Sequence, residues 1–193
     1  MVELSILKTN IRINFLFVAM LSLLSLTDKS GCVFLSVLFS LLHEMGHIAA
    51  MEICKERIES LTFHPFGIAM RLSTGSALSF GQEFFVLISG CAVNLIFALL
   101  FTGSNTAYIN IGMLTFNMLP VANLDGGRIL RLFLTRLFGE RAGNMASNAV
   151  SFVVLVPLSA LAFYTVTRTR QFSLVVCCIY LVIITVFKRD KLA

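Results

Sequence analysis

Charged residues are scarce in this chain. Only 13% of its 193 residues are charged, 58% are hydrophobic, and the mean hydropathy is +0.91. A soluble domain carries about 25% charged residues. The composition therefore excludes an ordinary soluble domain. It predicts an all-α polytopic membrane protein with little room for a separate soluble domain.

Several sequence features that the chain lacks exclude further classes of protein. The five cysteines form no CxxC pair and lie scattered in apolar runs, so we interpret them as small buried hydrophobic residues. No small-residue cleavage signature follows the first apolar run, which predicts a retained span rather than a cleaved signal. None of the twelve glycines is followed two places later by serine, as an intramembrane serine protease would require. An aspartyl protease needs two membrane aspartates, and only Asp125 qualifies.

Uncharged apolar runs predict about six transmembrane helices. A span needs about 20 residues, so the shorter runs must extend into their flanks, and the second continues to about Cys54. We expect a single membrane-embedded domain over residues 1–193, with a core at about 32–130 and the last two helices within about 142–187. The six runs lie at about residues 13–27, 32–43, 84–101, 108–124, 142–167 and 171–187.

The basic residues are unevenly divided between the two sides of the predicted membrane. With six spans, twelve of the fifteen fall on one side, and only Lys29, Arg168 and Arg170 fall on the other. The positive-inside rule then predicts that both termini are cytoplasmic. Basic residues that anchor the connecting segments on the cytoplasmic side account for the net charge of +5. We therefore expect the chain to contact the lipid bilayer and not nucleic acid.

Two segments interrupt the helical pattern. Between the second and third spans, residues 61–72 surround Pro65-Phe66-Gly67 and predict a short β-hairpin-like insertion. The fourth run ends in residues 117–128, where Pro120, two asparagines and a Gly-Gly pair predict a broken helix 4. Irregular backbone at membrane depth is tolerated only where it lines a cavity or packs on protein.

The motif His43-Glu44-Met45-Gly46-His47 lies within the second apolar run. Ionisable residues inside a membrane are costly and by default indicate function. On a helix, His43 and His47 lie one turn apart on one side, and HExxH on a helix is the zinc-hydrolase pattern. The alternative is a pair of hydrogen-bonded core histidines with Glu44 paired to an arginine.

A catalytic zinc usually has three protein ligands and a position for water. Of the ten acidic residues, only Glu44 and Asp125 lie deep within apolar surroundings. Asp125 is therefore the favoured third ligand of one Zn²⁺ per subunit, with Gly126 and Gly127 letting the backbone approach the metal closely. His64 is the competing ligand. Glu44 would take a proton from the zinc-bound water and pass it to a departing amine, which predicts amide hydrolysis.

His43-Glu44-Met45-Gly46-His47, followed by Leu124-Asp125-Gly126-Gly127, resembles the site-2 protease family of zinc intramembrane metalloproteases. The resemblance covers roughly residues 32–130. It is strongest to the sporulation branch, the stage IV FB protease, although the cytoplasmic nucleotide-sensing (CBS) domain of many members is missing. Cys91 and Asn123 stand where prolines are common in the family.

The resemblance implies specific roles and surroundings. His43, His47 and Asp125 would be zinc ligands and Glu44 the catalytic acid and base. Asn117 would bind substrate backbone or stabilise the oxyanion, or alternatively would satisfy backbone groups left by Pro120. We assign Asn94 a helix-packing role.

The resemblance also implies partners and a location. The implied substrate is a membrane-tethered protein such as a sporulation sigma-factor precursor, cut near its cytoplasmic side in regulated intramembrane proteolysis. Membrane regulatory or inhibitory proteins and a bacterial inner, cell or forespore membrane are implied as well. Residues 61–72 would either pair with the unwound substrate as a strand or only cover the mouth of the site. A zinc transporter and a catalytically silent scaffold are the alternative functions.

Overall fold

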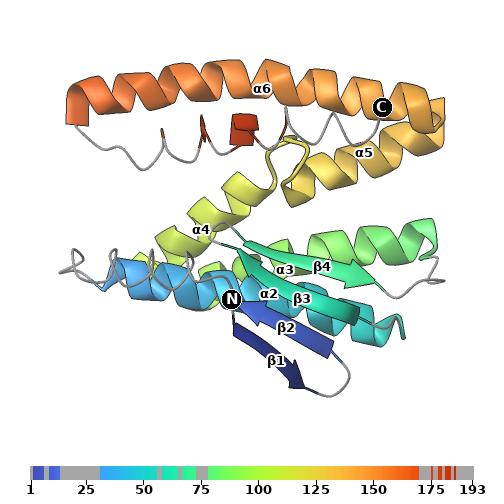
Figure 1. Cartoon of the computed structure of the whole chain (residues 1–193). Coiled ribbons are helices and arrows are strands. Elements are labelled where there is room, and N and C mark those ends of the chain that lie inside the picture. The colour runs from blue at the N-terminus through green and yellow to red at the C-terminus, as the bar shows by residue number, and fades with distance from the viewer. Residues whose placement is uncertain are drawn as a thin grey trace. The chain divides into compact units, whose positions relative to one another are not determined.

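The computed structural model describes residues 2–6, 9–13, 31–55, 58–64, 67–72 and 78–169, and beyond these residues 175, 178, 179, 181–183 and 185. The chain forms two compact units, Met1–Leu114 and Thr115–Ala193. Figure 1 labels the elements of each unit. The first unit contains β1 (Val2–Ile6), β2 (Thr9–Ile13), α2 (Cys32–Ile53), β3 (Ile58–His64), β4 (Gly67–Leu72), α3 (Phe80–Leu100) and most of α4 (Asn105–Asn117). The second contains α5 (Asp125–Phe138) and α6 (Glu140–Thr169).

Three helices within the described residues are long and apolar enough to cross a membrane: Cys32–Ile53, Phe80–Leu100 and Glu140–Arg168. They match the second, third and fifth predicted spans. The 13-residue α4 is shorter than the roughly 20 residues that a span needs. The first and sixth predicted spans lie mostly outside the described residues, so the number of six stays a prediction.

The insertion between α2 and α3 is made of strands. β3 and β4 pair antiparallel, with His64 opposite Gly67. β2 pairs parallel with β3, and β1 pairs antiparallel with β2, which gives the strand order β1-β2-β3-β4. The sequence did not predict β1 and β2. Their pairing with β3 joins segments that are about 50 residues apart, and no local pattern indicates such a contact.

In the first unit, α2 and α3 pack against each other. α3 begins with a capping box, because Ser79 Oγ accepts from the Gln82 backbone N–H and Gln82 Oε1 accepts from the Ser79 backbone N–H. The rings of Phe39 on α2 and Phe97 on α3 meet edge to face, with centroids 5.1 Å apart. Along this seam α3 supplies groups that hold the motif of α2.

The predicted break after the fourth apolar run is confirmed. α4 ends at Asn117, α5 begins at Asp125, and residues 118–124 form turns. The helix α5 itself was not predicted, because its basic residues indicated a connecting segment. In the structure Arg128, Arg131 and Arg136 are exposed, while the apolar residues between them are largely half-buried. A helix with such a charged face is amphipathic, and a search for uncharged runs misses it.

In the second unit, one face of α6 packs against α5 and the broken segment. Gly143, Ser147, Ser151 and Leu155 recur every fourth residue and are all buried. A methyl group at Gly143 would overlap the Thr135 backbone of α5, so the two helices approach closely there. Val121 of the broken segment is completely buried and belongs to one apolar cluster with Leu155.

Candidate metal centre

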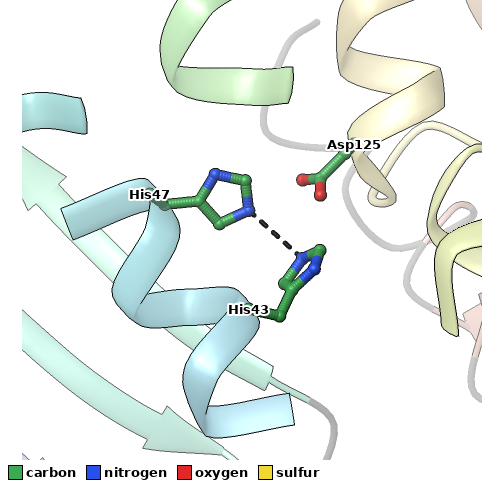
Figure 2. A group of neighbouring side chains, drawn as sticks. All are labelled: His43, His47 and Asp125. Atoms are coloured by element: carbon green, nitrogen blue, oxygen red, sulfur yellow. Dashed lines mark hydrogen bonds between the residues drawn. The ribbon is translucent and has the colours of Figure 1, made fainter. Parts of the chain in front are cut away.

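The two histidines of the motif face each other on α2. His43 and His47 are only 5% and 6% exposed, although both are ionisable. Their Nε2 atoms lie 3.2 Å apart, and the ring planes meet at 84°. Figure 2 shows both rings on one side of the helix. The helical spacing therefore brings the two imidazoles together as the sequence predicted.

The opposite ring nitrogens contact α3. His47 Nδ1 lies 2.7 Å from the Val86 carbonyl oxygen. A carbonyl can only accept, so Nδ1 carries a proton, and Nε2 of the neutral ring carries none. Asn94 Nδ2 lies 3.1 Å from His43 Nδ1. Metal-binding histidines typically donate their second ring N–H to an acceptor, as His47 does here, because the contact fixes the tautomer and the ring orientation.

Two glycines make room for this arrangement. A Cβ atom at Gly46 would lie 2.8 Å from Val93 Cγ2 and 2.9 Å from the Ser89 carbonyl oxygen, so only glycine lets α2 approach α3 this closely. A Cβ atom at Gly90 would overlap His47 Nε2 and lie 2.8 Å from Nε2 of His43. Small residues are the usual means of close packing between membrane helices. Gly90 also keeps a side chain away from the two Nε2 atoms.

Asp125 is the first residue of α5 and is 7% exposed. The amino end of a helix stabilises a carboxylate through the helix dipole and the N–H groups of the first turn. That Gly126 and Gly127 let the backbone approach a metal stays a prediction, and the structure gives a packing reason for both glycines. A methyl group at Gly126 would overlap the Met118 carbonyl, and one at Gly127 would overlap the Val121 carbonyl. The glycines thus let the start of α5 pack directly on the broken segment.

Ser151 of α6 holds the broken segment in the second unit. Its Oγ accepts from the Ala122 N–H at 3.0 Å and donates to the Ser147 carbonyl oxygen at 2.8 Å. Ser151 is completely buried. The segment just before Asp125 therefore has one of its backbone donors satisfied by a side chain, as buried irregular backbone requires.

Figure 2 shows the side chains of His43, His47 and Asp125 together. One candidate ligand atom from each lies within 4.8 Å of the others, close enough for one metal ion. Two nitrogen ligands of a tetrahedral zinc are about 3.3 Å apart, given a Zn–N bond of about 2.0–2.1 Å. The observed 3.2 Å between the two Nε2 atoms matches that value. Two neutral imidazoles and a carboxylate are also a donor set that catalytic zinc uses.

The other predicted site residues lie as follows. Glu44 follows His43 on α2 and is half-buried. Asn117 is the last residue of α4 and is also half-buried. No hydrogen bond of its side chain occurs within the described ranges, so nothing there supports the alternative role beside Pro120. His64 ends β3, and its side chain lies outside what is described, so its competing claim as a ligand stays untested.

Sequence reasoning missed four residues that build the site: Val86, Gly90, Asn94 and Ser151. The sequence assigns Asn94 a helix-packing role, and the structure adds a contact between its amide and His43. Gly90 and Asn94 are spaced one helical turn apart, and that spacing was the available signal. Val86 acts through its backbone, and Ser151 through a contact 29 residues away in sequence, so neither gave a local signal.

Comparison with known proteins finds two similarities in sequence. Residues 103–161, which include Asp125, match the model of Peptidase family M50. A protein of Mycobacterium tuberculosis, named "Putative zinc metalloprotease Rip3" in strains Erdman and H37Rv, is 33% identical over 136 residues. That match covers 60% of this chain and 34% of the relative, so the chain spans about a third of that protein's length.

A solved structure has a similar fold. The "Site-2 Protease from Methanocaldococcus jannaschii" superimposes with a TM-score of 0.68, covering 93% of this chain and 91% of that one. The two sequences are 19% identical, so this likeness concerns the fold.

Proposed function

We propose that this chain is an intramembrane zinc metalloprotease of peptidase family M50, of the site-2 protease type. The observation that carries the proposal is the pair of buried imidazoles, whose Nε2 atoms lie 3.2 Å apart beside Glu44 in a helix apolar enough to cross a membrane. The family match over residues 103–161 supports it independently, because those residues exclude the HExxH motif.

His43, His47 and Asp125 would hold one zinc ion per subunit. All three side chains are buried, and burial of ionisable groups without compensation is expensive. When bound, zinc acts as a Lewis acid that polarises a carbonyl and lowers the pKa of a water molecule to about 7.

Glu44 would move the proton of the reaction. Its carboxylate accepts a proton from the attacking water as the water oxygen bonds to the peptide carbonyl carbon. The same carboxyl group then donates that proton to the amide nitrogen, and the C–N bond breaks. Asn117 would support the developing oxyanion or bind the substrate backbone, since it ends α4 just before the broken segment.

The substrate would be a membrane-tethered protein, cut in or near its transmembrane segment. Each peptide carbonyl of a helix is hydrogen-bonded within that helix, so the substrate must unwind locally before hydrolysis. We propose that the unwound strand pairs with the β3–β4 insertion, because β4 ends the strand order and has one backbone edge without a neighbouring strand in the described sheet. A tethered sigma-factor precursor is one candidate substrate, and membrane regulatory proteins are candidate partners.

The proposed topology places both termini in the cytoplasm of a bacterial cell, with the excess of Lys and Arg on that side. Cleavage would then release a cytoplasmic fragment. Reporter fusions at each connecting segment and at both termini test the orientation. Activity at either terminus of a reporter that works only outside the cytoplasm would contradict it.

A cleavage assay tests the activity. The chain is co-expressed with a panel of tagged single-span proteins, and each is scored for a shortened fragment beside Glu44→Gln. We expect the parent to cut at least one substrate, and Glu44→Gln to keep its zinc but lose activity by about 10²–10⁴-fold. A zinc transporter does not specifically need this proton acceptor. Equal cleavage by both proteins, or material that binds no zinc, would refute the proposal.

A further inference from the structure

Two asparagines of the first unit, Asn94 and Asn110, are completely buried and have an amide oxygen without a hydrogen-bond partner in the described part of the chain. Asn94 differs from Asn110 because its amide nitrogen lies 3.1 Å from Nδ1 of a candidate ligand, His43. A buried amide with one half satisfied is costly, and such a group in a native structure calls for an explanation.

The contacts around the histidines indicate where each ring proton lies when both rings are neutral. His47 donates through Nδ1 to the Val86 carbonyl, so Nε2 of the neutral ring carries no proton and can only accept. In the contact between the two Nε2 atoms, His43 is then the donor. The proton of His43 therefore lies on Nε2, and its Nδ1 accepts from the amide nitrogen of Asn94.

Metal binding requires the other tautomer of His43. A ligand nitrogen must be bare, so the remaining ring proton must be on Nδ1, where it needs an acceptor. A turn of the Asn94 amide about its last torsion exchanges nitrogen for oxygen at nearly the same positions. The amide oxygen, which has no partner in the described structure, would then accept the proton of Nδ1.

We infer that Asn94 is a positioning residue for the metal centre, whose amide serves both tautomers of His43 by donating through Nδ2 or accepting through Oδ1. This inference rests on the metal site of the proposed function. Asn94 acts through His43 and needs no contact with the metal or with the substrate. Gly90, one turn earlier on α3, keeps the space around the two Nε2 atoms open, so one face of α3 both orients the ligands and makes room for the ion.

Substitutions at Asn94 separate positioning from helix packing. Leucine has nearly the same shape but cannot hydrogen-bond, so a packing role would tolerate Asn94→Leu. A positioning role would not, and loss of such a supporting contact typically weakens metal binding by 10–100-fold. Aspartate has the same shape and accepts the Nδ1 proton, so Asn94→Asp is expected to bind metal within a few-fold of the parent.

The matched control is Asn110→Leu. Asn110 is also completely buried, but its amide nitrogen donates to the Thr106 carbonyl within α4 rather than to a histidine. The same substitution there removes a buried asparagine without touching a candidate ligand. We expect no change in metal affinity.

The experiment measures Zn²⁺ affinity by chelator competition, and the absorption spectrum with Co²⁺ bound, for detergent-purified full-length proteins. We expect Asn94→Leu to lose 10–100-fold in affinity and to alter the Co²⁺ spectrum, while Asn94→Asp and Asn110→Leu stay near the parent. Equal affinity of Asn94→Leu and the parent would overturn the inference. So would a 10–100-fold loss for Asn94→Asp, an outcome that is decisive even if the leucine variant does not fold. A parent protein that binds neither metal would instead overturn the proposed function.

Discussion

Replacing Gly90 by alanine puts a methyl group where the two histidines meet. The new Cβ atom would overlap His47 Nε2 and lie 2.8 Å from both Cε1 and Nε2 of His43. Ordinary contacts between such atoms are about 3.5–4.0 Å, so each ring would have to move away from the new methyl group by roughly 0.7 Å or more. Two ligands of one metal resist that movement, because the ion fixes the positions of both Nε2 atoms.

The expected loss follows from the cost of overpacking. Inserting a methyl group into a filled site typically costs about 1–3 kcal/mol. Without metal the rings can turn aside, so most of this cost falls on the metal-bound protein. At about 1.4 kcal/mol for each factor of ten, Zn²⁺ affinity should fall by about 5- to 150-fold.

Chelator competition on purified protein measures this loss, and Gly112→Ala is the matched control. Gly112 is also a helical glycine, but a Cβ atom there would have no neighbour within 4 Å. We expect Gly112→Ala to bind Zn²⁺ as the parent does. If Gly90→Ala also binds Zn²⁺ with the parent's affinity, the ion does not lie between the two imidazoles, and the reasoning about this site is refuted.

Three further predictions concern the chemistry and the broken segment. Removing zinc with 1,10-phenanthroline should abolish cleavage and lower the melting temperature. A ligand at 100 times its Kd stabilises the folded protein by about 2.7 kcal/mol, and this stabilisation would be lost. Cleavage that survives complete removal of zinc would contradict the prediction. Ser151→Ala should destabilise the protein by about 1–3 kcal/mol in thermal unfolding, because the Ala122 N–H loses its acceptor. Ser159 is exposed, so Ser159→Ala should leave the stability unchanged. Equal melting temperatures of the two variants would count against this contact. Gly127→Ala should cost about 1–3 kcal/mol in the same assay, because its methyl group would overlap the Val121 carbonyl, and an unchanged transition would show that the start of α5 does not pack there.

The candidate ligands could be found from the sequence because ionisable residues are rare in apolar segments, where their burial costs free energy. Two histidines one turn apart in an apolar run, and one aspartate in a broken apolar segment, stand out without any knowledge of tertiary contacts. The apolar run around the motif also predicted where α2 ends, at about Cys54, and the structure has the end at Ile53. Uncharged runs likewise gave the positions of α3 and α6 to within a few residues.

The supporting groups could not be predicted because they act across the chain. Val86 contacts His47 through a backbone carbonyl, a group that every residue has. Asn94 is 51 residues from His43 in the sequence. An asparagine in a membrane helix can equally serve to pack helices together, so its type alone does not reveal a contact with a histidine. The packing role of Gly126 and Gly127 could not be predicted either, because only the fold shows that the broken segment turns back onto the start of α5.

X-ray absorption of the zinc-loaded protein tests the metal centre most directly, by comparing the parent with His43→Ala and Asp125→Ala. The parent should show first-shell nitrogen and oxygen at about 2.0–2.2 Å with the outer-shell scattering of two imidazoles, and no sulfur at about 2.3 Å. His43→Ala should lose one imidazole, and Asp125→Ala should keep both while losing affinity. A sulfur shell, or spectra that neither substitution changes, would show that zinc is bound elsewhere.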